Sequence, residues 1–233
     1  MSTPPMFNEL ELTEIHAETP ELTHLELRPD PDFLAAYKTP GQYVQVKTGD
    51  HKPGFFALSS GPGEKKLSLL IKGGNPAADA ILATNVGGTL QVSAPAGAGY
   101  PFDEARGRDL FLIGVGSGMA PLRAVIHAVM RDRETFKRVC FIYGARTQVS
   151  FPYQAEVGAW AEHDIDVRCV CSQPQADQWT GRVGRVQQCL LQDFTAIAPD
   201  SMVFVCGMKA MVEGVKSAFG NLGLPPERVR QNF

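Results

Sequence analysis

The stretch from Leu110 to Arg123 constrains the fold of this chain more than any other. Its sequence is LFLIGVGSGMAPLR, an apolar run that leads into three alternating glycines and then, after Pro121, into an apolar segment with helical spacing. An uninterrupted apolar run is typical of a strand covered on both faces in a parallel sheet. Proline in a first turn loses no helical hydrogen bond. The stretch therefore predicts a strand, a loop and a helix in that order.

The loop of this stretch has the features of an anion-binding site. Gly114, Gly116 and Gly118 carry no Cβ atoms, so the backbone N–H groups can approach a pyrophosphate at the positive end of the helix. The spacing is G-x-G-x-G, which differs from the G-x-G-x-x-G dinucleotide fingerprint. A tight turn that needs positive φ would also explain the glycines, and the loop alone leaves both interpretations open.

From residue 106 to 233, short apolar runs alternate with segments of helical periodicity. Strands are expected at 110–113, 139–143, 165–171 and 202–206, and helices at 121–130, 153–161, 183–192 and 208–222. This alternation predicts an α/β domain with a doubly wound parallel sheet. In the usual strand order the last strand lies beside the first, which places Cys206, Gly207 and Met208 opposite the glycine loop. A dinucleotide can bind in the crevice between them.

From residue 7 to about residue 99 the chain has a period of two, with proline and glycine turns between short apolar runs. Strands are expected at 7–15, 22–27, 42–47, 55–59, 66–71 and 89–93. Asn75 and Pro76 predict a helix over 76–83, because they suit the N-cap and the first turn. Six short strands at this spacing predict an antiparallel β-barrel of the Greek-key type. A polar joint at 102–109 connects it to the second domain.

Composition narrows the possible functions. The net charge is −3, without a basic stripe or an acidic tail, which excludes the common nucleic-acid-binding classes. No apolar run is long enough for a membrane span, and the N-terminus lacks the pattern of a signal peptide. The five cysteines and five histidines are scattered, without the spacing of a zinc or iron–sulfur site, so no metal is expected. Scattered thiols predict a cytoplasmic protein.

Three motifs together resemble the ferredoxin–NADP⁺ reductase superfamily. They are the glycine loop with Ala-Pro-Leu-Arg at 114–123, the segment VCGMKAM at 205–211, and PGQYV at 40–44. Segments 143–147 and 179–183 are also similar to the family, so the resemblance covers nearly the whole chain. It implies a flavin-binding barrel at 1–105, an NAD(P)-binding domain at 106–233, and hydride transfer from NAD(P)H to the flavin. The electrons would then pass to a ferredoxin, a cytochrome, a partner subunit or a small molecule. Family precedent favours FAD over FMN.

The resemblance also implies the residues that bind the nicotinamide nucleotide. They are Gly114, Gly116, Ser117, Gly118, Met119, Ala120, Pro121, Arg146, Ser172, Gln173, Cys206, Gly207, Met208 and Met211. Cys206 would lie against the nicotinamide and act as a catalytic residue, although a buried cysteine that ends a core strand is the alternative. NADP-binding relatives often carry Ser-Arg where this chain has Ser172 and Gln173. A glutamine does not neutralise a 2′-phosphate, which favours NADH, but Arg146, Arg182 and Arg185 leave NADPH open.

The flavin motif departs from the family pattern R-x-[YF]-S. Phe56 supplies the aromatic face and is assigned a catalytic role, whereas Gly54 stands in place of the arginine and Ala57 in place of the hydroxyl residue. The flavin-binding residues expected from the resemblance are Phe56, Ala57, Leu58, Ser59, Ser60, Ile71, Lys72, Gly73, Gly74, Asn75 and Phe233.

Several of these assignments have alternatives. The segment 72–75 could receive the flavin pyrophosphate through Lys72 and backbone amides, or could be an ordinary capped turn. Phe233 could cover the flavin or pack against the sheet. The departures at Gly54 and Ala57 also leave open a non-catalytic nucleotide-binding or regulatory module of the same fold.

Overall fold

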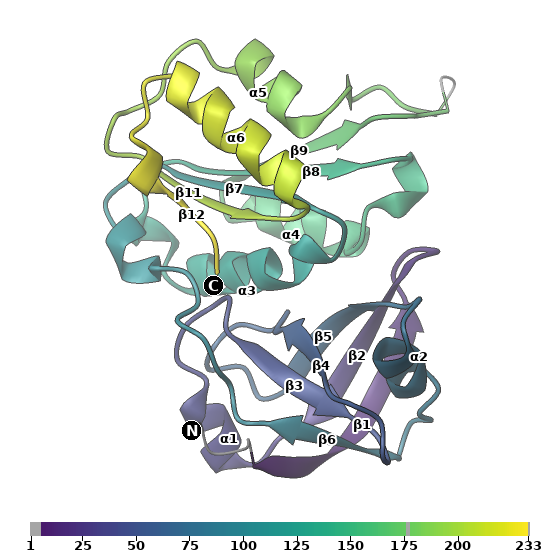
Figure 1. Ribbon diagram of the computed structural model, residues 1–233. Coiled ribbons are helices and arrows are strands. Elements are labelled where there is room, and N and C mark those ends of the chain that lie inside the picture. The colour runs from purple at the N-terminus through teal and green to yellow at the C-terminus, as the bar shows by residue number, and fades with distance from the viewer. Residues whose placement is uncertain (1–5, 176–177, 233) are drawn as a thin grey trace.

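The computed structural model describes residues 6–175 and 178–232. Figure 1 shows two domains, an antiparallel barrel and an α/β domain, with helix α3 between the parallel sheet and the barrel. No helix within the described ranges is long and apolar enough to cross a membrane.

The first domain is the expected antiparallel barrel. Its strands are β1 (Phe7–Ala17), β2 (Leu22–Arg28), β3 (Tyr43–Lys47), β4 (Gly54–Ala57), β5 (Leu67–Lys72) and β6 (Thr89–Ser93), in the order β4-β3-β6-β1-β2-β5. The chain after β4 approaches β5 through a bridge between Leu58 and Leu69, and the amide of Ser59 donates to the carbonyl of Ser68 at 2.8 Å. These contacts nearly close the barrel around alternating leucine and valine side chains.

Two short helices accompany the barrel. The expected helix is α2 (Pro76–Leu82), capped by Asn75, whose side chain accepts from the amide of Ala78. The helix α1 (Pro31–Ala36) stands where Pro29, Asp30 and Pro31 predict a turn between two strands. Asp30 accepts from the amide of Phe33 at 2.7 Å, and the burial of Phe33 stabilises the helix. Aspartate followed by proline suits both a turn and a helix start, so the tertiary contact decides.

The second domain is a parallel sheet in the order β10-β9-β8-β7-β11-β12. The strands are β7 (Leu110–Val115), β8 (Val139–Ala145), β9 (Ile165–Cys171), β10 (Arg182–Val183), β11 (Met202–Cys206) and β12 (Val229–Arg230). The predicted pairing of β11 with β7 is confirmed, and its register aligns Cys206 with Gly114. Strands β10 and β12 are too short to leave a periodic signal in the sequence.

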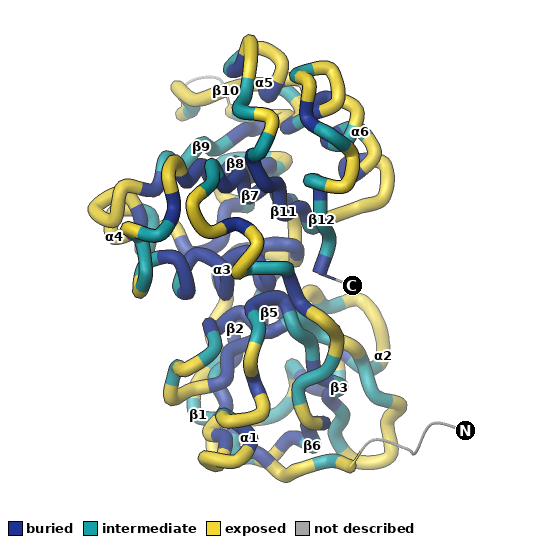
Figure 2. The backbone as a smooth tube through the Cα atoms, turned by 90° about the vertical axis from the view of Figure 1, so that its left-hand side faces the viewer, coloured by how far each residue is buried: buried dark blue, intermediate teal, exposed yellow. Residues whose placement is uncertain are grey.

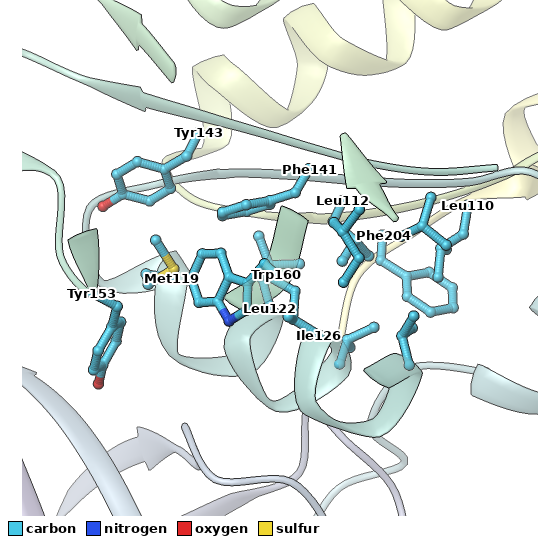
Figure 3. Packing of buried hydrophobic residues seen from close by; sticks show 14 of the residues in the cluster. Leu110, Leu112, Met119, Leu122, Ile126, Phe141, Tyr143, Tyr153, Trp160 and Phe204 are labelled. Carbon is cyan, nitrogen blue, oxygen red and sulfur yellow. The ribbon is translucent and has the colours of Figure 1, made fainter. Parts of the chain in front are cut away.

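Four helices cover this sheet: α3 (Met119–Arg131), α4 (Val157–Glu162), α5 (Val186–Asp193) and α6 (Lys209–Asn221). Helices α3 and α4 pack on one face, and α5 and α6 on the other (Figure 1). Figure 3 shows Leu122 and Ile126 of α3 and Trp160 of α4 beneath Leu112 and Phe141 of the sheet. Apolar residues on both sheet faces explain the uninterrupted apolar strands.

Three predicted boundaries in this domain are wrong. Gly114 belongs to strand β7 and not to the loop, because its backbone pairs with β8 and β11. The helix expected at 183–192 begins at Val186, since Arg182 and Val183 pair with β9. The helix expected at 153–161 begins as a 3₁₀ turn at Gln154–Glu156, because Tyr153 has φ of 57°. Strand pairing decides the first two boundaries, and the turn at Tyr153 decides the third.

Helix α3 also joins the two domains. The Arg123 guanidinium donates to the carbonyl of Ser59 in the barrel at 2.9 Å and forms an ion pair with Glu156 at 2.6 Å. His127 contacts Glu64 of the barrel at 2.9 Å through Nδ1 and Glu156 at 3.0 Å through Nε2. In Figure 2 the buried backbone continues from the sheet through α3 to β5.

The charges in this cluster stabilise one another. Burial by itself would raise the pKa of Glu156, but hydrogen bonds from His127 and Arg123 outweigh it and hold that pKa at about 2. Burial opposes a charge on His127, yet its bonds to Glu156 and Glu64 raise its pKa above the ordinary value. The ionised forms of all these groups therefore favour the docked arrangement of the domains.

The low pKa of Glu156 predicts a pH-dependent contribution to stability. Its folded pKa lies below the unfolded value, so the contribution is present above about pH 4.5 and is lost as the pH falls towards 2. Glu156→Gln should lower the free energy of unfolding by on the order of 3 kcal/mol near neutral pH, and the difference from wild type should vanish in acid. Denaturant unfolding of both proteins across this pH range measures it.

The contribution of His127 to stability has the opposite pH dependence to that of Glu156. Its raised folded pKa means that its contribution is complete below about pH 6.5 and is lost as the pH rises through the folded value. A constant difference between wild type and Glu156→Gln from pH 7 down to pH 2 would contradict the assigned ion cluster.

Candidate functional site

A cleft of about 1240 Å³ lies between the domains, where the carboxyl ends of β7, β8, β9 and β11 face the barrel. On the sheet side its wall is formed by 115–118, Ala120, Pro121, 143–146, Ser150, Ser172, Gln173, 184–187, 206–208, Ala210, Met211 and Asn232. On the barrel side it is formed by Thr19, Glu21, Leu22, Tyr43, Phe55, Phe56, Ala57, Leu70, Lys72, Gly73 and Asn75. The glycine loop and the segment after β11 therefore meet at one cleft.

The glycine loop is built by close packing at the start of α3. Gly116 has φ of 56°, a conformation that favours glycine, and its carbonyl accepts from the Tyr143 hydroxyl at 2.7 Å. A Cβ on Gly118 would lie 2.3 Å from the carbonyl oxygen of Cys206, so only glycine allows this approach. The positive end of α3 thus faces the cleft beside Cys206, which suits an anionic ligand.

The segment after β11 forms the facing wall. Burial raises the pKa of the Cys206 thiol to about 11, partly offset by a hydrogen bond with Tyr100. The thiol is therefore neutral near physiological pH and offers a small polarisable surface, not a nucleophile. A Cβ on Gly207 would lie 2.4 Å from the Met211 methyl group, so Met211 packs directly against this turn.

The ends of β8 and β9 lie at a third part of the cleft. The Arg146 guanidinium donates to the side-chain oxygen of Gln173 at 2.8 Å. The backbone N–H of Gln173 donates to the backbone carbonyl of Arg146 at 2.7 Å. Ser172 lies beside them, and Arg185 lines the same cleft from the start of α5. Two cations and two hydrogen-bonding side chains thus surround this end.

The barrel wall is aromatic. The rings of Tyr43 and Phe55 lie 5.7 Å apart at their centroids, and Phe55 is 67 % exposed. Phe56 is half-buried against the barrel core and Ala57 against the core of α3. A flat apolar ring could stack on these faces, so the wall fits the isoalloxazine of a flavin.

The same wall does not fit flavin phosphates in the way the family pattern implies. A Cβ on Gly54 would lie 2.7 Å from Phe56 Cε2, so the Phe56 ring fills the space of a longer side chain at position 54. Lys72 donates to Glu21 at 2.6 Å, and the Gly74 amide donates to Asp79 at 2.7 Å. Lys72 and the Gly74 amide, two of the donors expected to receive the pyrophosphate, are therefore paired with carboxylates.

Several predicted site residues do not line the cleft, namely Leu58, Ser59, Ser60, Ile71, Gly74, Gly114 and Met119. The side chains of Leu58 and Ile71 lie in the barrel core, and Met119 lies in the core beneath the sheet. The Ser60 hydroxyl accepts from the amide of Ser68 instead of facing the cleft. Phe233 lies outside the described residues.

Some cleft residues carried no expectation from the sequence. Thr19 and Glu21, in the turn before β2, have no recognisable motif, and Phe55 occupies the variable position of the flavin motif. Tyr43 stands within PGQYV and could have been assigned from that motif. Among residues 6–175 and 178–232, no group of three or more His, Cys, Asp or Glu side chains could hold a metal ion.

The high pKa of the buried thiol predicts low reactivity. At neutral pH the Cys206 thiolate is a minute fraction, so iodoacetamide should label Cys206 at least about tenfold more slowly in the native protein than in the denatured protein. Peptide mass spectrometry after timed quenching measures both rates. Equal labelling rates would show that Cys206 is exposed and ionised.

Comparison with known proteins adds evidence from outside this chain. The family model for the oxidoreductase NAD-binding domain matches residues 112–217. The gamma subunit of sulfhydrogenase 1 from Pyrococcus furiosus is 31 % identical over 204 residues, which cover 86 % of this chain and 70 % of that protein. An NAD(P)H-flavin reductase from Aliivibrio fischeri is 25 % identical over 199 residues, which cover 81 % of this chain and 82 % of that protein.

Solved structures show the same fold. A ferredoxin NADP⁺ reductase from Neisseria gonorrhoeae, with bound FAD and NADP, superposes with a TM-score of 0.84 at 18 % identity and covers 98 % of this chain and 99 % of its own. A cytochrome P450 reductase from Amycolatopsis has the same TM-score at 21 % identity and covers 99 % of this chain and 71 % of its own. The chain belongs to the ferredoxin–NADP⁺ reductase family.

Proposed function

We propose that this protein is an oxidoreductase that transfers a hydride from NAD(P)H to a flavin and passes the electrons to a separate acceptor. The observation that carries the proposal is the single cleft in which the glycine loop, the Cys206–Met208 segment and an aromatic barrel wall face one another. A dinucleotide bound to the first two would direct its reactive ring towards the third. The flavin reductase of Aliivibrio fischeri supports this class of reaction.

The proposed role of each residue follows from its position in the cleft. Gly116, Ser117 and Gly118, with the start of α3, hold the pyrophosphate of the nucleotide. Cys206 and Gly207 position the nicotinamide, and the neutral thiol neither donates charge nor attacks it. Phe56 and its aromatic neighbours support the flavin ring, and the domain contact through α3 keeps the two walls at a fixed distance. A bound flavin, FAD by family precedent, supplies the hydride acceptor.

The acceptor of the electrons is a separate molecule in this proposal. The relative from Pyrococcus furiosus is one subunit of a larger enzyme, which supports a partner subunit or another redox protein as acceptor. The five cysteines are free thiols, which is typical of a reducing compartment and supports the cytoplasm as the location.

Anaerobic reduction tests the proposed reaction. After reconstitution with FAD, addition of NADH should bleach the flavin absorption band. Gly118→Ala, which forces a Cβ against Cys206, should weaken NADH binding at least about tenfold while the protein still folds. The matched control is Gly158→Ala in α4, where a Cβ meets open space. A protein that binds no flavin would instead support the non-catalytic module.

The end of the cleft at Gln173 governs the choice of nucleotide in this proposal. Gln173 accepts from Arg146 and adds no positive charge, which favours NADH over NADPH. Gln173→Arg would add a second guanidinium beside Arg146. It should raise the ratio of kcat/KM for NADPH to that for NADH by about tenfold or more. An unchanged ratio would refute the placement of the adenosine ribose here.

The control for this substitution is Gln175→Arg. Gln175 is exposed, hydrogen-bonds to Gln148, and does not line the cleft. The same change of charge two positions away should leave the ratio within about twofold of wild type, since exposed charges at a distance are screened.

A further inference from the structure

The barrel wall of the cleft combines aromatic side chains with one carboxylate, that of Glu21. Phe55 is exposed beside Tyr43, and the two rings, tilted by 57° with their centroids 5.7 Å apart, each present an aromatic face at the cleft. Aromatic faces stack on one another independently of any charged tail. This part of the wall can therefore bind a flat heteroaromatic ring whatever group the ring carries.

Position 54, where the family pattern has an arginine, carries no side chain and lies against the Phe56 ring. A Cβ at Gly54 would lie 2.7 and 2.8 Å from two atoms of the Phe56 ring and 3.5 Å from Ala77 of α2. A side chain at position 54 would require the Phe56 ring to shift. The Phe56 ring therefore packs beside Gly54, and no cation is present at this position of the strand.

The charged donor on this wall is paired with a carboxylate, and so is one backbone amide beside the wall. Lys72 is the one cation among the described barrel residues of the cleft, and it pairs with Glu21, which lines the same cleft. The bond from Lys72 lowers the pKa of Glu21, so Glu21 is ionised at neutral pH. The backbone N–H of Gly74 donates to the Asp79 carboxylate. Together Lys72 and Glu21 leave this wall without net charge, and Glu21 repels an incoming phosphate.

We propose that this site recognises a flavin by its isoalloxazine ring and not by its phosphates, so that riboflavin, FMN and FAD bind with similar affinity and exchange freely. The proposal rests on the proposed function and specifies its flavin as an exchangeable substrate. A flavin reduced in the cleft can then leave and carry its electrons to the acceptor.

Equilibrium dialysis of the full chain against each flavin at low and high salt tests this proposal. Riboflavin is uncharged, whereas FMN and FAD carry phosphate charges, so the three compare ring recognition with phosphate recognition. The dissociation constants should agree within about threefold and should not change with salt. FMN or FAD binding more than about tenfold tighter than riboflavin, with an affinity that falls in salt, would overturn the proposal.

The same measurement separates this inference from the proposed function. If none of the three flavins binds, the proposed function fails together with the inference. If FAD alone binds tightly, the inference fails and the proposed function stands.

Two variants test whether the wall recognises the flavin ring or its phosphates. Phe55→Ala should weaken all three flavins by the same factor, about fivefold, because it removes a stacking surface from the exposed wall. Glu21→Gln releases Lys72 and should strengthen FMN and FAD by about threefold, with no change for riboflavin. Glu14→Gln, at an exposed barrel carboxylate outside the cleft, is the control and should change none of them.

The double variant Lys72→Met with Glu21→Gln gives the opposite test. It should change the three dissociation constants by the same factor, because the pair has no net charge in the wild type and none in the double variant. A loss of about tenfold for FMN and FAD, with riboflavin unaffected, would show that the ammonium binds the phosphates and would overturn the proposal.

Discussion

The cleft depends on the contact between the start of α3 and the end of β11. Gly118 lies so close to the Cys206 carbonyl that no other residue fits between them. This contact places the positive end of a long helix beside the turn at Gly207. Any ligand that binds one wall therefore meets the other, and the site needs no movement of the sheet to assemble.

The same helix determines how the barrel stands over the sheet. Its first turn faces the cleft, and Arg123 and His127 further along reach Ser59 and Glu64 of the barrel. The ion cluster is mostly shielded from solvent, so its charges interact more strongly than surface pairs do. The start of α3 thus lines the cleft while its later turns hold the barrel.

The charges in the cleft are unevenly distributed. Arg146 and Arg185 lie at the sheet end, whereas the barrel wall balances Lys72 against Glu21 and presents aromatic rings. An anionic nucleotide is thus attracted to the sheet, and an apolar ring is accommodated at the barrel. This division suits a protein in which the two ligands differ in charge and lie in contact at their rings.

The sequence by itself determined the two domains, the strand–loop–helix unit at 110–123 and the pairing of β11 with β7, because periodicity and turn chemistry are local properties. It located Cys206 and Gln173 at the cleft through the family motifs. Only the tertiary structure decided that Ser60 and Ile71 point inward and that Lys72 meets Glu21. Glu21 and Lys72 lie 51 positions apart along the chain, and burial and charge pairing depend on how separate segments pack.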